Sequence, residues 1–492
     1  MSVVERSKLA HHDLAIGGSR VRATGGGTFE IKNPYTEEVI ATVAAGTRED
    51  ARIAIETAAA AFPAWAATPP VARQRIFLAA ADELARRRDD VIAMLARETG
   101  CTFGFAMFQM GFVPGLFRQA AGLAYHPTGQ VIPSDVPGTF AMGIRRPVGV
   151  VAAISPWNAA LILSARSIAA PLVAGNSVVL KPSPNSPMVG GLLWAEIFEE
   201  AGLPPGVLNV ITHAHGEGSN IGDEFAENPR VRRINFTGSS GVGRKIAETA
   251  GRNLKRVVLE LGGHNPLLVL ADADLDYAVN AATFGAYLHQ GQICMSTRRI
   301  IVEQPIAAEF EKKMTAKVAG LKQGDPLEMD TIIGPLISRG ALEKVSSRVD
   351  GAVKAGARLL AGGTSNGLVY AATLLADVPE SSDLLRHETF GPVAALEVVA
   401  NADAGVEAAN ATAYGLSAGI ITTDADRGMA LANRIEAGII HINDQTIGDE
   451  PQMPFGGVKD SGWGRFGGAA ALDEFSELKW VTVTSGSHPY PF

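Results

Sequence analysis

The chain has 492 residues, more than a single hydrophobic core normally organises, so we expect two or three domains. Hydrophobic residues make up 47% of the chain and charged residues 19%, a balance that excludes a largely disordered protein. The formal net charge of −8 excludes a general attraction to nucleic acid, and no apolar run is long enough to predict a membrane span.

The first 45 residues contain short apolar runs between turn-forming residues, a pattern that predicts short strands. Residues 48–61 and 70–98 are rich in Ala and Arg, with apolar residues at helical spacing, and predict amphipathic helices. Residues 140–147 predict a projecting strand between glycine and proline breaks. From there, apolar strands alternate with helical stretches, which is typical of a parallel sheet covered by helices. The predicted strands cover residues 148–154, 177–180, 207–211, 233–236 and 256–260.

A second alternating pattern runs from about residue 266 to residue 399 and contains Cys294. It predicts another α/β domain, which would face the first across a cleft. Because ligands of parallel sheets bind at the carboxyl ends of strands, the residues that follow each strand are candidates for a binding site.

Cys294 is the candidate nucleophile, because it is one of only two cysteines and lies in a short polar segment with glycine nearby. Gly291, Ser296 and Thr297 lead us to expect an accessible polar environment in which a thiolate persists. Cys101 follows a helical stretch and is interpreted as structural. Two cysteines cannot form a disulfide framework, and residues 1–8 contain no apolar signal segment, so a cytoplasmic location is expected.

Three polar residues accompany this cysteine, and each has two interpretations. Asn158 follows Pro156 and Trp157, so its amide is either a fixed oxyanion donor or a helix N-cap. Glu260 ends an apolar strand and is either a solvated carboxylate or a general base with a pKa raised by burial. Glu388 lies on a turn with the same two interpretations.

Other polar residues suggest a nucleotide. Gly238 and Gly243 bracket a turn that enters a helix, where phosphate can bind, although most glycine-rich turns are only turns. Lys181 ends a strand and can reach ribose hydroxyls or simply remain solvated. The segment with His213, His215 and Glu217 has too few ligands for a metal, so we expect a solvated loop and no metal.

Several motifs, in order along almost the whole chain, resemble those of the NAD(P)-dependent aldehyde dehydrogenase superfamily. They are Pro156-Trp-Asn158, Lys181-Pro182, Phe236-Thr-Gly-Ser239, Glu260-Leu-Gly-Gly263, Gly291-Gln-Ile-Cys294, Glu388-Thr-Phe-Gly-Pro392, Pro454-Phe-Gly-Gly457 and Ser461-Gly-Trp-Gly-Arg465. The resemblance implies an α/β fold with two parallel-sheet domains, one Rossmann-like for the cofactor and one catalytic, and a bridging β element for oligomerisation. The implied boundaries are 1–125 with 147–258 for NAD(P), 259–469 for catalysis, and 126–146 with 470–492 for oligomerisation.

The resemblance also implies the chemistry. Cys294 would attack the aldehyde carbon, while Asn158 and the backbone N–H of Cys294 would hold the oxyanion. The thiohemiacetal would pass hydride to the nicotinamide, and a water activated by Glu260 would hydrolyse the resulting thioester to the acid. The implied cofactor residues are Trp157, Lys181, Ser183, Gly238, Ser239, Gly243, Leu261, Glu388 and Phe390.

One departure from the family bears on the cofactor. Many NAD-preferring members carry Glu three residues after the equivalent of Lys181, where this chain has Pro184. Without that carboxylate, repulsion of the NADP phosphate is weaker, so NAD is expected and NADP use is plausible.

The finer resemblance is to bacterial dehydrogenases of benzaldehyde, vanillin or salicylaldehyde. The small Ala159 would leave room for a planar ring. Arg166 lies on an apolar helix and either meets substituents of the ring at the entrance or forms an internal ion pair. The expected substrate residues are Ala159, Arg166, Ile293, Met295 and Phe455.

The alternatives are a CoA-acylating enzyme, an aliphatic semialdehyde dehydrogenase and a non-catalytic NAD-binding protein. Glu260 argues against the CoA-acylating branch, in which the base is typically missing. Cys294, Asn158 and Glu260 together argue against a non-catalytic protein. The strand near Phe140 and residues 480–485 resemble elements that pair across subunits, so a homodimer or homotetramer is expected, with a small aldehyde as substrate and neither nucleic acid nor membrane as partner.

Overall fold

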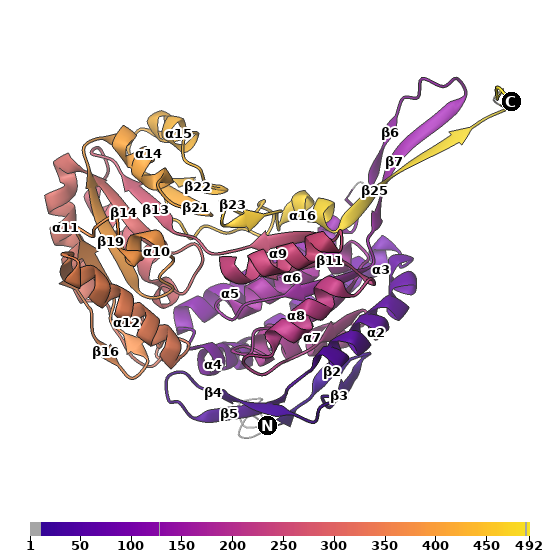
Figure 1. Cartoon of the computed structure of the whole chain (residues 1–492), viewed down its shortest axis with the longest axis horizontal. Coiled ribbons are helices and arrows are strands. Elements are labelled where there is room, and N and C mark those ends of the chain that lie inside the picture. Colours follow the sequence, from indigo (N-terminus) through magenta and orange to yellow (C-terminus); the bar gives the residue numbers. More distant parts are fainter. Residues whose placement is uncertain (1–10, 127, 488–489) are drawn as a thin grey trace.

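A computed structural model describes residues 11–126, 128–487 and 490–492. The chain forms two α/β bodies, each built on its own sheet, and a narrow sheet that projects from one of them (Figure 1). The predicted α/β class, with two sheets that contain parallel strands and one projecting β element, is confirmed. The expectation about residues 1–8 lies outside the described residues.

The N-terminal part supplies short strands and four helices. The strands are β1 (His11–His12), β2 (Leu14–Ile16), β3 (Ser19–Val21), β4 (Thr28–Lys32) and β5 (Val39–Ala44), and the helices are α2 (Arg48–Ala66), α3 (Pro70–Arg86), α4 (Arg88–Thr99) and α5 (Phe103–Leu123). Thr47 begins α2 with a capping box, since its hydroxyl accepts from the Asp50 N–H and the Asp50 carboxylate accepts from the Thr47 N–H.

The single helix predicted over residues 70–98 is wrong, because the backbone leaves helical geometry at Arg87 and divides it into α3 and α4. The Arg87 guanidinium bonds there to Glu83 and also to Glu196 and Glu200 of a helix distant in sequence. These tertiary ion pairs hold the break, and local periodicity carries no sign of them.

The first sheet has the strand order β24-β12-β11-β8-β9-β10-β2-β3. Its five predicted strands are present as β8 (Val150–Ile154), β9 (Ser177–Lys181), β10 (Leu208–Val210), β11 (Val231–Thr237) and β12 (Arg256–Glu260). These five pair in parallel, and β24 (Gly462–Trp463) adds to β12 in antiparallel orientation. The helical segments between them are α6 (Ala160–Val173), η1 (Met188–Leu192), α7 (Leu193–Glu200), α8 (Gly218–Glu227) and α9 (Ser240–Arg252).

The second sheet has the order β15-β18-β19-β14-β13-β21-β22. Its strands are β13 (Asn265–Val269), β14 (Thr297–Glu303), β15 (Arg358–Ala361), β18 (Thr373–Ala376), β19 (Val393–Val399), β21 (Ser417–Ile421) and β22 (Ile439–Ile442). Its helices are α10 (Leu275–Tyr287), η2 (Leu288–Gly291), α11 (Gln304–Ala319), α12 (Arg339–Lys354), α13 (Asp383–Arg386), α14 (Ala402–Asn410) and α15 (Ala425–Ala432). Short elements complete this part: β16 (Ser365–Asn366), β17 (Val369–Tyr370), β20 (Tyr414–Gly415), β23 (Val458–Lys459) and α16 (Gly468–Glu474).

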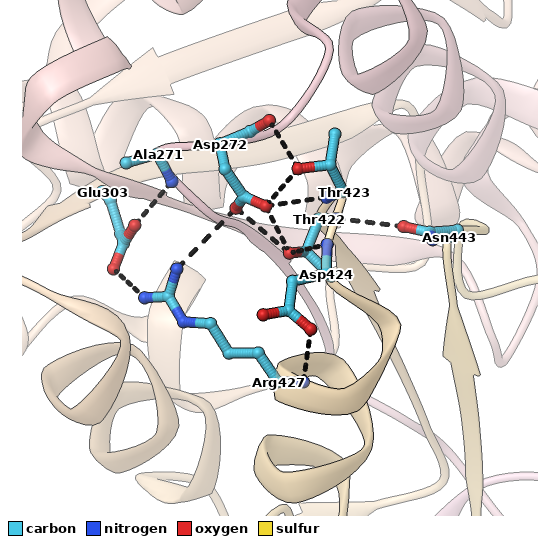
Figure 2. A network of polar contacts seen from close by, with 8 residues as sticks. All are labelled: Ala271, Asp272, Glu303, Thr422, Thr423, Asp424, Arg427 and Asn443. Atoms are coloured by element: carbon cyan, nitrogen blue, oxygen red, sulfur yellow. Dashed lines mark hydrogen bonds and ion pairs between the residues drawn. The ribbon is translucent and has the colours of Figure 1, made fainter.

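The carboxyl ends of β13, β14 and β21 are joined by a polar network (Figure 2). The Asp272 carboxylate accepts from the hydroxyls of Thr422 and Thr423 and from the Thr423 N–H. Glu303 accepts from the Ala271 N–H at 2.5 Å, and Arg427 bridges Glu303 and Asp272. The donors and acceptors of this edge therefore bond to one another.

The projecting sheet consists of β6 (Gly129–Ile132), β7 (Thr139–Pro147) and β25 (Ser476–Thr484), in the order β25-β7-β6 (Figure 1). The predicted projecting strand is confirmed as β7, and it pairs antiparallel with β25 from Thr139 opposite Thr484 to Pro147 opposite Ser476. Large apolar side chains are exposed on this sheet, and Trp480 is 80% exposed. Within the described ranges, no helix has both the length and the apolar character to cross a membrane.

Candidate active site

The two sheets contribute opposite ends of their strands to one site. Strands β9 and β12 of the first sheet end at Lys181 and Glu260, whereas β14 of the second sheet begins at Thr297, three residues after Cys294. Asn265, at the start of β13, donates its side-chain N–H to the Cys294 carbonyl at 2.7 Å and the Ser296 carbonyl at 3.0 Å. A single amide therefore attaches the nucleophile segment to the second sheet.

The segment before Cys294 is strained. His289, Gln290 and Gly291 have φ values of 51°, 54° and 64°, so three consecutive residues adopt the left-handed conformation. Such geometry costs about 1–3 kcal/mol for each non-glycine residue and persists only where surrounding contacts impose it. One such contact is the Gln290 amide, which donates to the carbonyls of Gly100 and Pro335 at 2.9 and 3.0 Å.

Cys294 itself is half-buried, and the expected accessible polar environment is wrong. The flanking Ser296 and Thr297 are fully buried; the Thr297 hydroxyl lies 2.8 Å from the Thr446 hydroxyl, whereas the Ser296 hydroxyl has no hydrogen-bond partner among the described residues. Burial raises the pKa of the Cys294 thiol to about 12, and the carboxylates of Glu388 and Glu260 add to the shift. The thiol form therefore dominates at neutral pH, and the site needs a base that removes its proton.

Glu260 is only 2% exposed, so the solvated interpretation is wrong. Both of its carboxylate oxygens are buried without a hydrogen-bond partner among the described residues. Burial raises the pKa of Glu260 well above its ordinary value, although the cations Arg166 and Arg465 oppose the shift. A carboxyl group in this state keeps its proton to higher pH than a solvated one, and its ionised form is a stronger base, as the expected role requires.

Asn158 is buried between strand β8 and helix α6, but it does not cap that helix. The N-cap position of α6 is occupied by Ala159, and no side chain makes a cap hydrogen bond there. The N-cap interpretation is therefore wrong, which leaves the amide of Asn158 available for the expected oxyanion contact.

Four of the five expected substrate residues belong to the large apolar core of the first body. Ala159, Ile293, Met295 and Phe455 are buried in one apolar cluster, and Cys294 packs at its margin. Apolar side chains thus gather beside the sulfur, as a hydrophobic substrate requires.

Arg166 forms the internal ion pair that was one of its two interpretations. Its Nη2 lies 2.7 Å from both carboxylate oxygens of Asp449, and its guanidinium carbon lies 4.5 Å from the centre of the Phe455 ring. Its Nε and Nη1 are buried without a hydrogen-bond partner among the described residues. Nothing in the sequence around Asp449 indicates that this carboxylate would face Arg166.

Lys181 and His213 form a buried pair at the carboxyl end of β9. The solvated interpretation is wrong for Lys181 and for His213, although His215 and Glu217 are exposed as expected. The Nδ1–H of His213 donates to the Ala214 carbonyl at 2.9 Å, so its Nε2 accepts from Lys181 Nζ at 2.7 Å. Burial lowers the pKa of Lys181 to about 7 and that of His213 to about 3.

Aromatic and acidic groups from the two sheets meet near Cys294. Trp157, after β8, and Phe390, before β19, contact edge to face with ring centres 5.7 Å apart. Glu388 accepts from the Gly263 N–H at 3.3 Å, while burial raises its pKa and the Arg298 cation opposes the rise. Residues 262 and 263 must be small, because a side chain at Gly263 would lie 2.5 Å from the Cys294 carbonyl oxygen.

The glycine turn lies at the start of α9, where Ser239 occupies the N-cap position. A side chain at Gly238 would lie 2.5 Å from the Phe236 ring, and one at Gly243 would lie 2.6 Å from Leu261. These two glycines therefore permit close packing within the turn. Ser183 is half-buried in the segment after Lys181, and its hydroxyl accepts from the Asn185 N–H at 3.2 Å. The residues expected to bind a dinucleotide thus lie at the carboxyl ends of the first sheet, with Glu388 and Phe390 opposite.

The model of the aldehyde dehydrogenase family matches residues 21–481. The chain belongs to this family. Vanillin dehydrogenase of Pseudomonas fluorescens is 47% identical to this aldehyde dehydrogenase over 478 residues, which cover 97% of this chain and 99% of that protein. The predicted family and enzyme class, an oxidoreductase acting on aldehydes, are confirmed.

Two solved structures give the same result for the fold. Salicylaldehyde dehydrogenase from Pseudomonas putida G7, complexed with salicylaldehyde, is 40% identical to this aldehyde dehydrogenase with a TM-score of 0.96, over 98% of this chain and 100% of that chain. Betaine aldehyde dehydrogenase from Staphylococcus aureus, in complex with NAD+, is 33% identical with a TM-score of 0.94, over 97% of this chain and 95% of that chain. The predicted aldehyde dehydrogenase-like fold is thereby confirmed.

Proposed function

We propose that the enzyme oxidises an aromatic aldehyde to its carboxylic acid with NAD, through a thiohemiacetal and a thioester on Cys294. The arrangement that carries the proposal is a half-buried thiol at the margin of an apolar cluster, with the unpartnered carboxylate of Glu260 near enough to influence its pKa. The relatives named for vanillin and salicylaldehyde support the aromatic class.

The residues act in two stages. In the first, the Cys294 thiol gives its proton to solvent water, its sulfur forms a bond to the aldehyde carbon, and the π pair of the C=O bond moves to oxygen, while the Asn158 amide donates to this new oxyanion. The chemistry that bound NAD supplies is acceptance of the hydride that leaves this carbon. In the second stage, Glu260 takes a proton from water, the hydroxide attacks the thioester carbon, and the carbon–sulfur bond breaks to release the acid and the thiolate.

For the cofactor, the buried Lys181 and the half-buried Glu388 are the proposed ribose ligands, with Ser183 beside Lys181. Ser239, with Gly238 and Gly243, would lie at the pyrophosphate, and Trp157, Leu261 and Phe390 would pack against the cofactor. The solved relative with bound NAD+ supports NAD. NADP is also proposed, because Pro184 introduces no negative charge near Lys181.

The test of this function measures absorbance of the reduced cofactor with a panel of substituted benzaldehydes and aliphatic aldehydes of similar size. We expect acid formation without CoA, faster turnover of aromatic aldehydes, and loss of activity in Cys294→Ala. Cys101→Ala is the matched control, because that fully buried thiol lies in the core and should be dispensable for turnover. A strict CoA requirement would favour the acylating branch, faster aliphatic turnover would favour a semialdehyde dehydrogenase, and an active Cys294→Ala variant would refute the mechanism.

Arg166 is proposed to recognise hydroxyl groups on the aromatic ring. The donors would be its Nε and Nη1, which have no hydrogen-bond partner among the described residues, whereas Nη2 is bound to Asp449. Removing Arg166 alone would strand the carboxylate of Asp449, so the informative variant is Arg166→Met with Asp449→Leu. We expect kcat/KM to fall about tenfold to a hundredfold more for hydroxylated benzaldehydes than for benzaldehyde. Equal losses on both substrates would contradict this role.

A homodimer or homotetramer is proposed to form through the projecting sheet, with the strand edges and exposed side chains of β6 and β25 meeting another subunit. Trp480→Glu should then reduce the molar mass measured by light scattering, whereas Met329→Glu, at an exposed position elsewhere, should not. Unchanged mass in Trp480→Glu would contradict the proposal. We also propose the domain boundaries 1–125 with 147–258, 259–469, and 126–146 with 470–492, and a cytoplasmic location.

A further inference from the structure

Two adjacent arginines on β14, Arg298 and Arg299, are both buried but have different partners. Arg299 forms a conventional ion pair, with its Nε and Nη2 each 2.6 Å from the Glu397 carboxylate. Arg298 is 3% exposed and bonds only to backbone carbonyl oxygens among the hydrogen bonds of the described residues. Burying a cation without a carboxylate partner is costly, so the position of Arg298 calls for an explanation.

The carbonyls that Arg298 binds belong to the two segments that form the proposed catalytic centre. Its Nη2 donates to Gly291, the last residue of the strained run before Cys294. Its Nη1 donates to Gly391 at 2.5 Å and to Val393 at 3.4 Å, just after Glu388 and Phe390. One guanidinium therefore connects the nucleophile segment to the segment proposed to hold the cofactor.

The fit between these segments is tight. A side chain at Gly291 would lie 2.2 Å from the Gly391 carbonyl oxygen and 2.8 Å from Arg298 Nη1. The planar fork of arginine can donate to carbonyls on both sides of this narrow space, which the single ammonium group of lysine does less well. The guanidinium also balances the negative ends of carbonyl dipoles that would otherwise face one another.

The charge of Arg298 acts on the same two segments. Burial lowers the pKa of Arg298 to about 10, so the group stays a cation at neutral pH. Glu388, Tyr287 and Cys294 oppose that shift, and by reciprocity the cation favours the ionised forms of Glu388 and Cys294.

We propose that Arg298 is a positioning residue, whose guanidinium holds Gly291 against Gly391 and thereby fixes the sulfur of Cys294 relative to the cofactor site. This inference rests on the proposed function for its catalytic consequence, because it assumes that Cys294 is the nucleophile and that the Glu388 segment binds NAD. Its structural part concerns only where the sulfur lies and which charges face it.

The test compares Arg298→Met with Arg299→Met, a matched control on the same strand that removes an equally buried arginine away from both segments. Steady-state kinetics with NAD and an aromatic aldehyde give kcat and each KM. The second readout is the pH dependence of Cys294 alkylation by iodoacetamide in the enzyme without NAD, followed by mass spectrometry of the Cys294 peptide. The charged and titratable groups that interact with the Cys294 thiol or the Arg298 guanidinium are Glu260, Glu388, Asp449, Arg166, Tyr287, Arg348 and His264.

For Arg298→Met, we expect kcat/KM for NAD to fall about a hundredfold, as small displacements of reacting groups produce. We also expect alkylation to require higher pH, because the nearby cation is lost. Arg299→Met should keep both properties within about twofold of the parent enzyme, even if its melting temperature falls. Should Arg298→Met not fold, Arg298→Gln, which keeps two donors but no charge, is expected to shift the alkylation profile in the same direction.

The inference is overturned if the alkylation profile and the kcat/KM for NAD are those of the parent enzyme and only the melting temperature falls. It is also overturned if Arg299→Met produces the same kinetic changes. Failure of the proposed function looks different, because the parent enzyme would then reduce no NAD with any aldehyde. The alkylation comparison would still report whether Arg298 fixes the environment of Cys294.

Discussion

The ion pair between Arg166 and Asp449 allows a sharp prediction about stability. The side chains are 3% and 9% exposed, and the carboxylate is bound through two contacts of 2.7 Å. Asp449→Asn preserves the shape of this residue but removes its charge, which leaves the Arg166 cation buried without a counter-ion. Removing one partner of such a pair costs about 3–5 kcal/mol. This is a large share of the roughly 5–15 kcal/mol by which folded domains are stable.

Replacing both charges should cost much less. In Arg166→Met with Asp449→Leu, no charge remains in the pocket, and the new side chains can pack against Phe112 and Phe455, the rings that now lie near the guanidinium. Such neutral replacements are often close to neutral in stability. The expected order of stability is therefore parent, then double variant, then Asp449→Asn.

Urea denaturation followed by tryptophan fluorescence measures this order, because Trp65 and Trp194 are fully buried in the core that contains Arg166. The free energies of unfolding of the parent protein, Arg166→Met, Asp449→Leu and the double variant form a cycle, and a coupling of about 1–3 kcal/mol is expected between the two sites. The reasoning is refuted if Asp449→Asn unfolds within about 1 kcal/mol of the parent protein or if the two single losses simply add.

Three further predictions concern the site. Burial raises the pKa of Glu260, and only the ionised carboxylate accepts a proton, so the rate of thioester hydrolysis should rise with pH through a midpoint above the usual carboxyl range. Glu260→Gln should flatten that profile and slow turnover about 10²–10⁴-fold. Rapid-mixing experiments on this variant should still show one burst of reduced cofactor per site. The pKa of Lys181 is lowered to about 7, so its cation is lost as pH rises, and the KM for NADP should increase between about pH 6 and about pH 8.5 more than the KM for NAD does; parallel changes would refute this. Gly263→Ala should abolish most activity, because the new methyl group would lie 2.5 Å from the Cys294 carbonyl oxygen. The control is Gly251→Ala, whose new methyl group would meet no described atom within 4 Å. This control should keep full kcat and gain about 0.5–1 kcal/mol of stability, measured by thermal melting.

The sequence predicts the parallel core well, because each strand from β8 to β12 is an apolar run bounded by turn residues. It does not predict the break at Arg87, which depends on carboxylates more than a hundred residues away. It also assigns no element to residues 103–123, which form the long helix α5 with Pro114 inside it. Periodicity reports the local chain, and these features depend on tertiary partners.

The candidate site shows the same division. Motifs identify Cys294, Asn158 and Glu260, and in the structure Asn158 and Glu260 are buried while Cys294 lies half-buried against the apolar cluster. No motif predicts that His213 is buried against Lys181, or that Arg298 donates to the carbonyls of Gly291 and Gly391. Each contact depends on which groups meet after folding. The left-handed run before Cys294 is equally hidden, since two consecutive non-glycine residues at positive φ are uncommon and Gln290 gives no local signal for that conformation.

The polar network in Figure 2 has a consequence for how the two halves divide their work. Open parallel sheets usually host small molecules at the carboxyl termini of their strands, yet here Asp272, Glu303 and Arg427 saturate one another at that location in the second sheet. The carboxyl-terminal edge of the second sheet is thus closed by these bonds. Cys294 lies at the opposite, amino-terminal edge of that sheet. The proposed catalytic and cofactor residues each come from both sheets, so a shift of one sheet against the other would disturb binding and catalysis together.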